Sequence, residues 1–160
     1  MLRLDPRVVY VVVGDGPSRR EMEELTRTKG IAAGFRFVGE IRHERVSKYR
    51  NLADIVLATS EREGFPFIYR EAQACARTVL ASDIAASREI IAEGETGALF
   101  RTGDIEDLAA KTLALAAAPG LRRQIGERAR AVAAKDDPEH WVKTYAELLS
   151  QTVAGHPMPT

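Results

Sequence analysis

Residues 55–71 have the sequence Ile-Val-Leu-Ala-Thr-Ser-Glu-Arg-Glu-Gly-Phe-Pro-Phe-Ile-Tyr-Arg-Glu. The stretch starts with four apolar residues, Ile55–Ala58, which predict a buried strand. A turn at Gly64 follows, and Pro66 suits the first position of a helix that we expect to run to about Ala76. A strand, a glycine turn and a helix start are the parts from which α/β proteins build a phosphate site.

Two carboxylates flank this turn, because Glu63 precedes it and Glu71 lies inside the expected helix. Free N–H groups near Phe65 and Phe67 would meet a diphosphate at the helix start. Ionised carboxylates repel phosphate and accept hydrogen bonds from hydroxyls, so we expect Glu71 to hold a ribose and Glu63 another polar group. A glycosidase pair is the less favoured alternative, since a phosphate site does nothing for a neutral glycoside.

Strands alternate with helices along most of the chain, which predicts a mostly parallel sheet covered on both faces. Ser18 and Glu21 form a capping-box pattern, and Asp104 is expected to cap the helix that follows it. We expect residues 8–13 to form a central strand. The predicted fold is α/β, a three-layer open parallel sheet with additional C-terminal helices, over a domain at 1–153 and a disordered tail at 154–160. We expect strands at 8–13, 35–38, 55–58, 78–81 and 97–100, and helices at 18–29, 43–51, 66–76, 87–92, 104–118, 121–134 and 138–152.

Two further glycine loops follow predicted strands. Gly14 and Gly16 come after residues 8–13, but the dinucleotide fingerprint fails because Arg19 stands at its third glycine. We therefore expect this loop to line a pocket without gripping phosphate, since ligands of open α/β sheets gather at that edge. Gly39 follows the next strand and would let a flat ring approach the backbone closely.

Composition excludes several classes of function. The chain has 23 basic and 23 acidic residues, and this zero net charge gives no support for a nucleic-acid partner. The sequence has no apolar run long enough to span a membrane. The single Cys75 allows no internal disulfide and is expected to be a small core residue. His43, His140 and His156 lack metal-ligand spacing, so no metal site is expected.

Taken together, the linked motifs resemble a known family, the retaining glycosyltransferases of the GT-B fold, group 1, also called family 4. The likeness covers roughly residues 8 to 141. It depends on two glutamates with seven residues between them, Glu63 and Glu71, which follow Ala53-Asp54 and surround Gly64-Phe65-Pro66. Further landmarks are Val13-Gly14-Asp15-Gly16-Pro17, Phe37-Val38-Gly39, Glu89-Ile90-Ile91, Gly94-Glu95-Thr96-Gly97 and Gly103-Asp104.

The resemblance implies a role for each matched position. It implies that Glu71 binds the ribose hydroxyls, that Glu63 faces the donor sugar as the catalytic residue, and that the backbone at 64–67 meets the sugar and diphosphate. It places residues 39–41 beside the base and residues 14–16 along the nucleotide pocket. The donor-binding residues implied in this way are Gly14, Gly16, Gly39, Glu40, Ile41, Glu63, Gly64, Phe65, Pro66, Phe67 and Glu71. The implied substrate is a UDP-sugar or GDP-sugar, with no metal or other cofactor.

The resemblance also implies an activity. The family transfers a hexose from a nucleotide diphosphate sugar with retained anomeric configuration, and we expect a glycan or glycolipid acceptor. The family's basic diphosphate clamp and its N-terminal acceptor domain precede the matched region, so we expect this chain to be a fragment of a larger two-domain enzyme. It would be the donor-binding C-terminal part of that enzyme, a Rossmann-like half of the GT-B fold. We expect it to be inactive alone and to self-associate through an exposed sheet edge. A cytoplasmic location, with peripheral contact at the inner membrane face, is expected for the parent enzyme.

Several positions depart from the family pattern. Pro66 replaces a glycine and removes one backbone donor. Ala76 and Thr78 stand where Gly and Pro are usual, and Ala85-Ala86 replace a glycine pair near the donor sugar. These changes leave two alternatives open, namely a non-catalytic nucleotide-sugar-binding module and a GT-B epimerase or phosphorylase.

Overall fold

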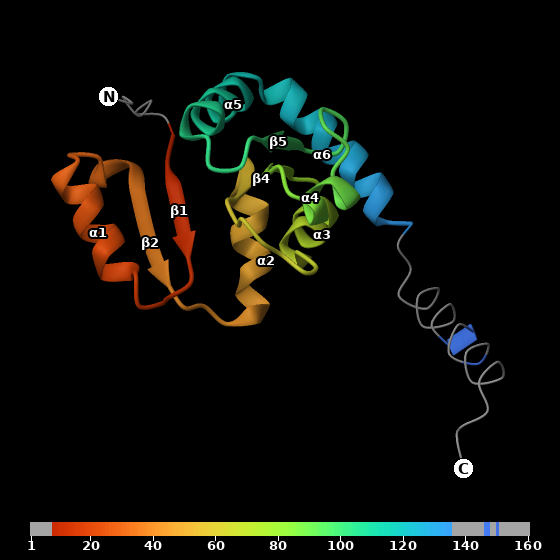
Figure 1. Ribbon diagram of the computed structural model, residues 1–160, viewed down its shortest axis with the longest axis horizontal. Helices are drawn as coiled ribbons and strands as arrows, with labels where there is room; N and C mark the ends of the chain where they lie inside the picture. The colour runs from red at the N-terminus through yellow and green to blue at the C-terminus, as the bar shows by residue number, and fades with distance from the viewer. Residues whose placement is uncertain (1–7, 136–145, 148–149, 151–160) are drawn as a thin grey trace, which may run out of the picture.

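The computed structural model describes residues 8–135, 146–147 and 150, and the fold over these residues is α/β (Figure 1). The predicted helix at 138–152 and tail at 154–160 fall almost wholly outside the described residues. The strands are β1 (Tyr10–Val13), β2 (Phe35–Gly39), β3 (Ile55–Ala58), β4 (Thr78–Ser82) and β5 (Ala98–Phe100). The helices are α1 (Arg19–Thr28), α2 (His43–Leu52), α3 (Phe67–Ala74), α4 (Ala85–Ile90), α5 (Ile105–Ala117) and α6 (Pro119–Ala133), with a 3-10 turn, η1, at Ala32–Gly34.

The strands form two parallel sheets where one was predicted. One sheet pairs β1 with β2, and the other has the order β3-β4-β5. Within the described residues no strand joins β1 to β3, so β1 is an edge strand and the prediction of a central strand is wrong for this chain. Three of its four residues are exposed, with Val11 at 51%. A continuous apolar run indicates burial only when neighbouring strands and helices cover it.

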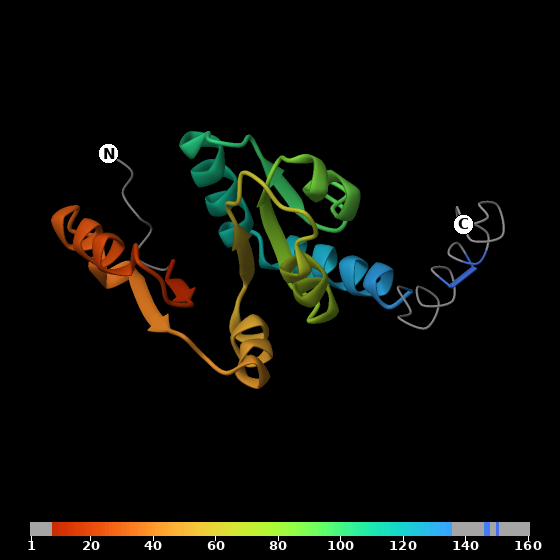
Figure 2. The same cartoon turned by 60° about the horizontal axis from the view of Figure 1, so that its bottom comes forward.

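The larger sheet has the predicted three layers (Figure 2). All five residues of β4 are buried. Val79 and Ala81 pack on one face with Tyr69 of α3 and Ile90 of α4. Successive strand residues point to opposite faces, so Leu80 lies on the other face with the apolar residues of α5 and α6. Because helices cover both of its faces, β4 lies at the centre of the core, and α3 packs directly against it.

Helix α6 is held against the end of α3 by a glycine. A Cβ atom built on Gly126 would lie 2.1 Å from the carbonyl oxygen of Ala76, so only glycine permits this approach. Ala76 has a φ of 53°, in the left-handed region that turns the chain from α3 into β4. The Thr78 hydroxyl then donates to the Arg122 carbonyl over 2.8 Å. These contacts set the position of α3, which carries Glu71.

The predicted helix starts had mixed outcomes. Asp104 caps α5, because its side chain accepts from the N–H of Asp107 over 2.8 Å, which confirms that prediction. Ser18 occupies the N-cap of α1 with helical backbone angles, and its side chain makes no capping bond, so the capping box is wrong. Pro66 is the N-cap of α3 and not its first residue. Cys75, expected in the core, is half-buried at the end of α3.

Candidate functional site

The loops that follow β1 and β2 are joined to each other at two glycines. The Gly14 N–H donates to the Gly39 carbonyl over 2.8 Å. Both residues have left-handed backbone angles, with φ of 121° at Gly14 and 84° at Gly39, which favours glycine at each. The Gly16 N–H donates to Asp15 Oδ1 over 2.8 Å. The structure thus brings the predicted pocket residues Gly14 and Gly39 together at the carboxyl edge of their sheet.

Arg19 closes this pair of loops through a contact that no local sequence pattern predicts. A Cβ on Gly39 would lie 2.6 Å from Arg19 Nη1, so the guanidinium lies directly over the glycine. The same side chain donates to Glu23 at 2.8 Å and to Asp15 at 3.1 Å. The hydrogen bond with Glu23, and then the one with Asp15, raise the pKa of Arg19. An arginine at the third glycine position of the fingerprint therefore binds the two loops together.

The loop between β3 and α3 carries the other half of the predicted site. Glu63, Gly64 and Phe65 are exposed, while Pro66 is buried and anchors the turn. The N–H of Phe67 donates to the Phe65 carbonyl over 3.0 Å, which corrects the prediction that it is free for an anion. In the part of the chain that the structure describes, no protein atom accepts from the N–H groups of Gly64 and Phe65. These two groups remain as donors for a ligand.

Two aromatic rings stand beside this turn. Phe65 and Phe67 are 56% and 69% exposed, and their ring centroids are 5.0 Å apart in an edge-to-face arrangement. The backbone of the turn is thus bordered by an apolar surface, which would exclude water from one side of a ligand held there.

Glu71 lies in a pocket between α2 and α3. Arg50 of α2 donates through Nη2 to Glu71 Oε2, and the two side chains are 16% and 35% exposed. The cavity has a volume of about 330 Å³ and is lined by His43, Glu44, Ser47, Arg50, Glu71, Ala74 and Cys75. Sequence reasoning missed Arg50 because the two partners are 21 residues apart and no local pattern joins them.

The second carboxylate is placed differently. Glu63 stays on the exposed loop and lines neither this cavity nor the larger one described below. Glu40 is exposed and Ile41 half-buried at the start of the connection from β2 to α2. The structure therefore places Glu71 in a cavity against α2, whereas Glu63 and the turn at Gly64 are exposed to solvent beside the start of α3.

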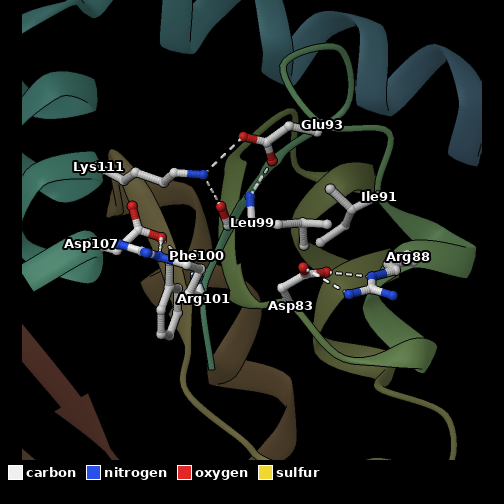
Figure 3. Close-up of a pocket in the computed structure, with 9 residues that line it drawn as sticks. All are labelled: Asp83, Arg88, Ile91, Glu93, Leu99, Phe100, Arg101, Asp107 and Lys111. Atoms are coloured by element: carbon white, nitrogen blue, oxygen red, sulfur yellow. Dashed lines mark hydrogen bonds and ion pairs between the residues drawn. The ribbon is translucent and has the colours of Figure 1, made fainter. Parts of the chain in front are cut away.

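A larger cavity of about 420 Å³ lies at the outer edge of β5 and contains none of the predicted site residues. Figure 3 shows Lys111 and Glu93 converging on the main chain of Leu99, with Asp83 and Arg88 paired separately. The hydrogen bond from Arg88 lowers the pKa of Asp83 below its ordinary value. The charged side chains that line this cavity pair with each other or bond to the main chain of β5, so they cover the edge of the sheet and form no ligand site.

Comparison with known proteins decides the family. The model of the family "Glycosyl transferases group 1" matches residues 1–132. The chain belongs to the group 1 glycosyltransferases. The expected resemblance is thereby confirmed.

A relative of known activity is the N-acetyl-alpha-D-glucosaminyl L-malate synthase of Bacillus anthracis, 31% identical over 120 residues. That match covers 75% of this chain and 31% of the relative. The chain spans 31–36% of the length of the first curated glycosyltransferases that it matches.

Solved glycosyltransferase structures share the fold. HepE from Anabaena, in complex with UDP, has a TM-score of 0.84 and 24% identity over 91% of this chain and 42% of that one. The C-terminal domain of the group 1 protein LpcC from Francisella tularensis has a TM-score of 0.72 and 24% identity. In that case the match covers 83% of this chain and 71% of the LpcC domain. These likenesses support a Rossmann-like half-domain.

The described residues lack two features. They contain no group of three or more His, Cys, Asp or Glu side chains placed to hold a metal ion. Over the same part of the chain, no helix has the length and apolar character of a membrane span.

Proposed function

We propose that this chain is the donor-binding C-terminal part of a retaining glycosyltransferase that moves a hexose from a nucleotide diphosphate sugar to a glycan or glycolipid. Residues 1–153 would form the donor domain, and the acceptor domain would come from the rest of the parent protein. The observation that carries this proposal is the position of Glu71 in a cavity, eight residues after Glu63, in a member of the group 1 family. UDP is the preferred nucleotide, because a structural neighbour is a UDP complex.

Within this proposal, Glu71 binds the ribose and Arg50 positions it. An ionised carboxylate has two oxygens and about four acceptor sites. Arg50 takes Oε2, so Oε1 remains to accept a ribose hydroxyl in a charge-assisted bond. Because Arg50 is only 16% exposed, it holds the carboxylate in one orientation. This arrangement supports ribose recognition at the wall between α2 and α3.

The diphosphate would lie at the turn that precedes α3. The N–H groups of Gly64 and Phe65 would donate to its oxygens, and the positive end of α3 would stabilise its charge. Glu63, on the same loop, would face the donor sugar. Gly39, Glu40 and Ile41 would border the base, and the loop from Gly14 to Gly16 would close the nucleotide pocket.

The leaving diphosphate develops negative charge that needs stabilisation. Few backbone donors are available here, since Pro66 has no N–H and the N–H of Phe67 is bonded to the Phe65 carbonyl. We therefore propose that the isolated chain binds nucleotide weakly and transfers no sugar. The same observation favours one second candidate, a non-catalytic nucleotide-sugar-binding module.

Isothermal calorimetry of UDP and GDP with the 160-residue chain tests the binding site. We expect Glu71→Ala to weaken UDP binding by about 1.5–3 kcal/mol, the range for a hydrogen bond to a charged group. This corresponds to roughly a 10- to 150-fold loss of affinity. Glu61→Ala, at an exposed position of the same loop, is the matched control and should leave the affinity unchanged.

Two results would contradict the proposal. Equal UDP affinity for the Glu71→Ala chain and the wild type, with equal melting temperatures, removes Glu71 from the site. Release of UDP from UDP-glucose by the isolated chain, above spontaneous hydrolysis, contradicts its proposed inactivity. To separate transferase from binding module, the product of the complete parent enzyme is analysed by NMR, which also reports the anomeric configuration.

A further inference from the structure

Arg19 connects three segments at the edge of the smaller sheet. Its Nη1 donates to Asp15 Oδ2 over 3.1 Å, and its Nε donates to Glu23 Oε1 over 2.8 Å. A longer bond of 3.4 Å runs from Nη2 to the Phe37 carbonyl. Asp15 belongs to the loop after β1, Glu23 to α1 and Phe37 to β2. Because the guanidinium is planar and holds its donors in a fixed geometry, it sets the positions of all three segments relative to one another.

The loop after β1 depends on few contacts. Gly14 and Gly16 are exposed, and a Cβ atom built on either of them meets no atom within 4 Å. The hydrogen bond from the Gly14 N–H to the Gly39 carbonyl fixes the start of the loop. Beyond it, the Arg19 N–H donates to the Gly16 carbonyl, and the Arg19 guanidinium holds Asp15. Since glycine has many accessible backbone conformations, the order of this loop depends strongly on Arg19.

The charges around Arg19 argue against a direct role with phosphate. Asp15 and Glu23 place two carboxylates against one guanidinium, so the cluster combines one positive charge with two negative charges. A cation that binds a diphosphate needs positive charge that its neighbours leave uncompensated. The three side chains are 30%, 52% and 35% exposed for Arg19, Asp15 and Glu23. The arrangement is therefore suited to holding main chain in place, with no positive charge left over for an anion.

Arg19 lies at the edge where the proposed function places the nucleotide. Figure 1 shows β1 and β2 running to the same edge of their sheet, which is where the two loops meet. The guanidinium fills the side of Gly39 on which another residue would carry its Cβ atom, 2.6 Å from that position. Gly39 is buried, whereas Gly14, Gly16 and Glu40 are exposed at this edge. A ligand would meet these exposed residues, and Arg19 sets the distance between the two loops that carry them.

We propose that Arg19 is a positioning residue for the nucleotide, which holds the loop at 14–16 and the end of β2 in one arrangement before the ligand binds. This role rests on the proposed function, which puts the nucleotide at this edge. Arg19 acts through the loops and bonds to no atom of the nucleotide. Because the loops are ordered in advance, the ligand does not have to order them when it binds. Loss of the side chain weakens binding by loosening the loops, while α3 and its Glu71 stay in place.

Three variants of the 160-residue chain test this inference, namely Arg19→Ala, Arg19→Lys and a matched control, Arg20→Ala, at the next and exposed position. NMR measures amide hydrogen exchange without ligand, and then the affinity for UDP by titration to millimolar concentration. We expect Arg19→Ala to speed exchange of the Gly14, Asp15 and Gly16 amides by about tenfold and to weaken UDP binding by about tenfold. Arg19→Lys should restore neither, since one ammonium group cannot span three partners. Arg20→Ala should match the wild type, and exchange in α3 should be the same in all four chains.

Each other result overturns the inference in its own way. Unchanged exchange at residues 14–16 in Arg19→Ala shows that the loop does not depend on Arg19. Faster exchange with unchanged UDP affinity shows that the nucleotide does not depend on the loop. Wild-type affinity in Arg19→Lys shows that the site uses the positive charge itself. A wild-type chain that binds no UDP overturns the proposed function, and this failure is recognised separately because exchange is measured without ligand.

Discussion

Replacing Gly126 with alanine should destabilise the protein through a single contact. The new Cβ would lie 2.1 Å from the carbonyl oxygen and 2.7 Å from the carbonyl carbon of Ala76. Both atoms belong to the main chain, which cannot rotate away as a side chain can. Helix α6 would therefore have to move until this separation of 2.1 Å reaches at least 3.4 Å, the distance of ordinary van der Waals contact.

The cost of that movement can be estimated from what α6 touches. Ile125 and Ala129 are 2% and 0% exposed in the layer under β4, and overpacking a core costs about 1–3 kcal/mol. The hydrogen bond from Thr78 to the Arg122 carbonyl would also lengthen, at about 1 kcal/mol. Replacing a helical glycine with alanine returns about 1 kcal/mol. We expect a net loss of about 1–3 kcal/mol, or a melting temperature lower by about 2–12 °C.

Urea denaturation followed by circular dichroism measures this loss, and Gly120 supplies the matched control. Gly120 lies in the same helix with open space around its Cβ position, so Gly120→Ala should be neutral or slightly stabilising. The reasoning is refuted if Gly126→Ala proves as stable as Gly120→Ala.

Three further predictions concern other contacts. Tyr69→Phe should cost about 1–3 kcal/mol in urea denaturation, because it leaves the fully buried Ser87 hydroxyl without its partner at 3.0 Å, and the double variant with Ser87→Ala should recover part of the loss. Asp83→Asn should lower the melting temperature at pH 7, because the ionised Asp83 carboxylate accepts a hydrogen bond from Arg88 that lowers its pKa. Protonation of Asp83 removes this stability, so the difference from wild type should close as the pH falls to about 2. A difference that stays constant with pH would argue against the ion pair. Glu93→Ala should increase light scattering at high protein concentration, because it uncovers the main-chain N–H of β5, and unchanged scattering would show that this edge needs no cover.

Local patterns in the sequence predicted the larger sheet well. The apolar run at 55–58 became β3 with the predicted bounds, because four apolar residues between polar ends have one favourable placement in a buried sheet. Asp104 was predicted as a cap because its carboxylate needs only the N–H three residues away. Predictions that depended on distant partners fared worse. The exposure of β1 could not be foreseen, since burial depends on which other strands are present.

In the candidate site too, the sequence predicted local positions but missed contacts between distant residues. Gly14, Gly39 and Glu71 were placed correctly at strand ends and on α3, as the strand–turn–helix pattern requires. Contacts between separate elements were missed, because nothing local records that Arg50 reaches Glu71 or that Arg19 covers Gly39. The assigned roles of Glu63 and Glu71 stay predictions.

The ion pair between Arg50 and Glu71 has a consequence for how the pocket tolerates different ligands. Helix α3 is embedded in the core, whereas α2 takes no part in the extensive packing between elements, and its Leu52 is 82% exposed. The α3 side of the pocket is consequently rigid, whereas α2 is held to it mainly by the ion pair between Arg50 and Glu71. If Glu71 binds the ribose as proposed, a ligand of different size would be accommodated by a shift of α2, with the hydrophobic core left undisturbed.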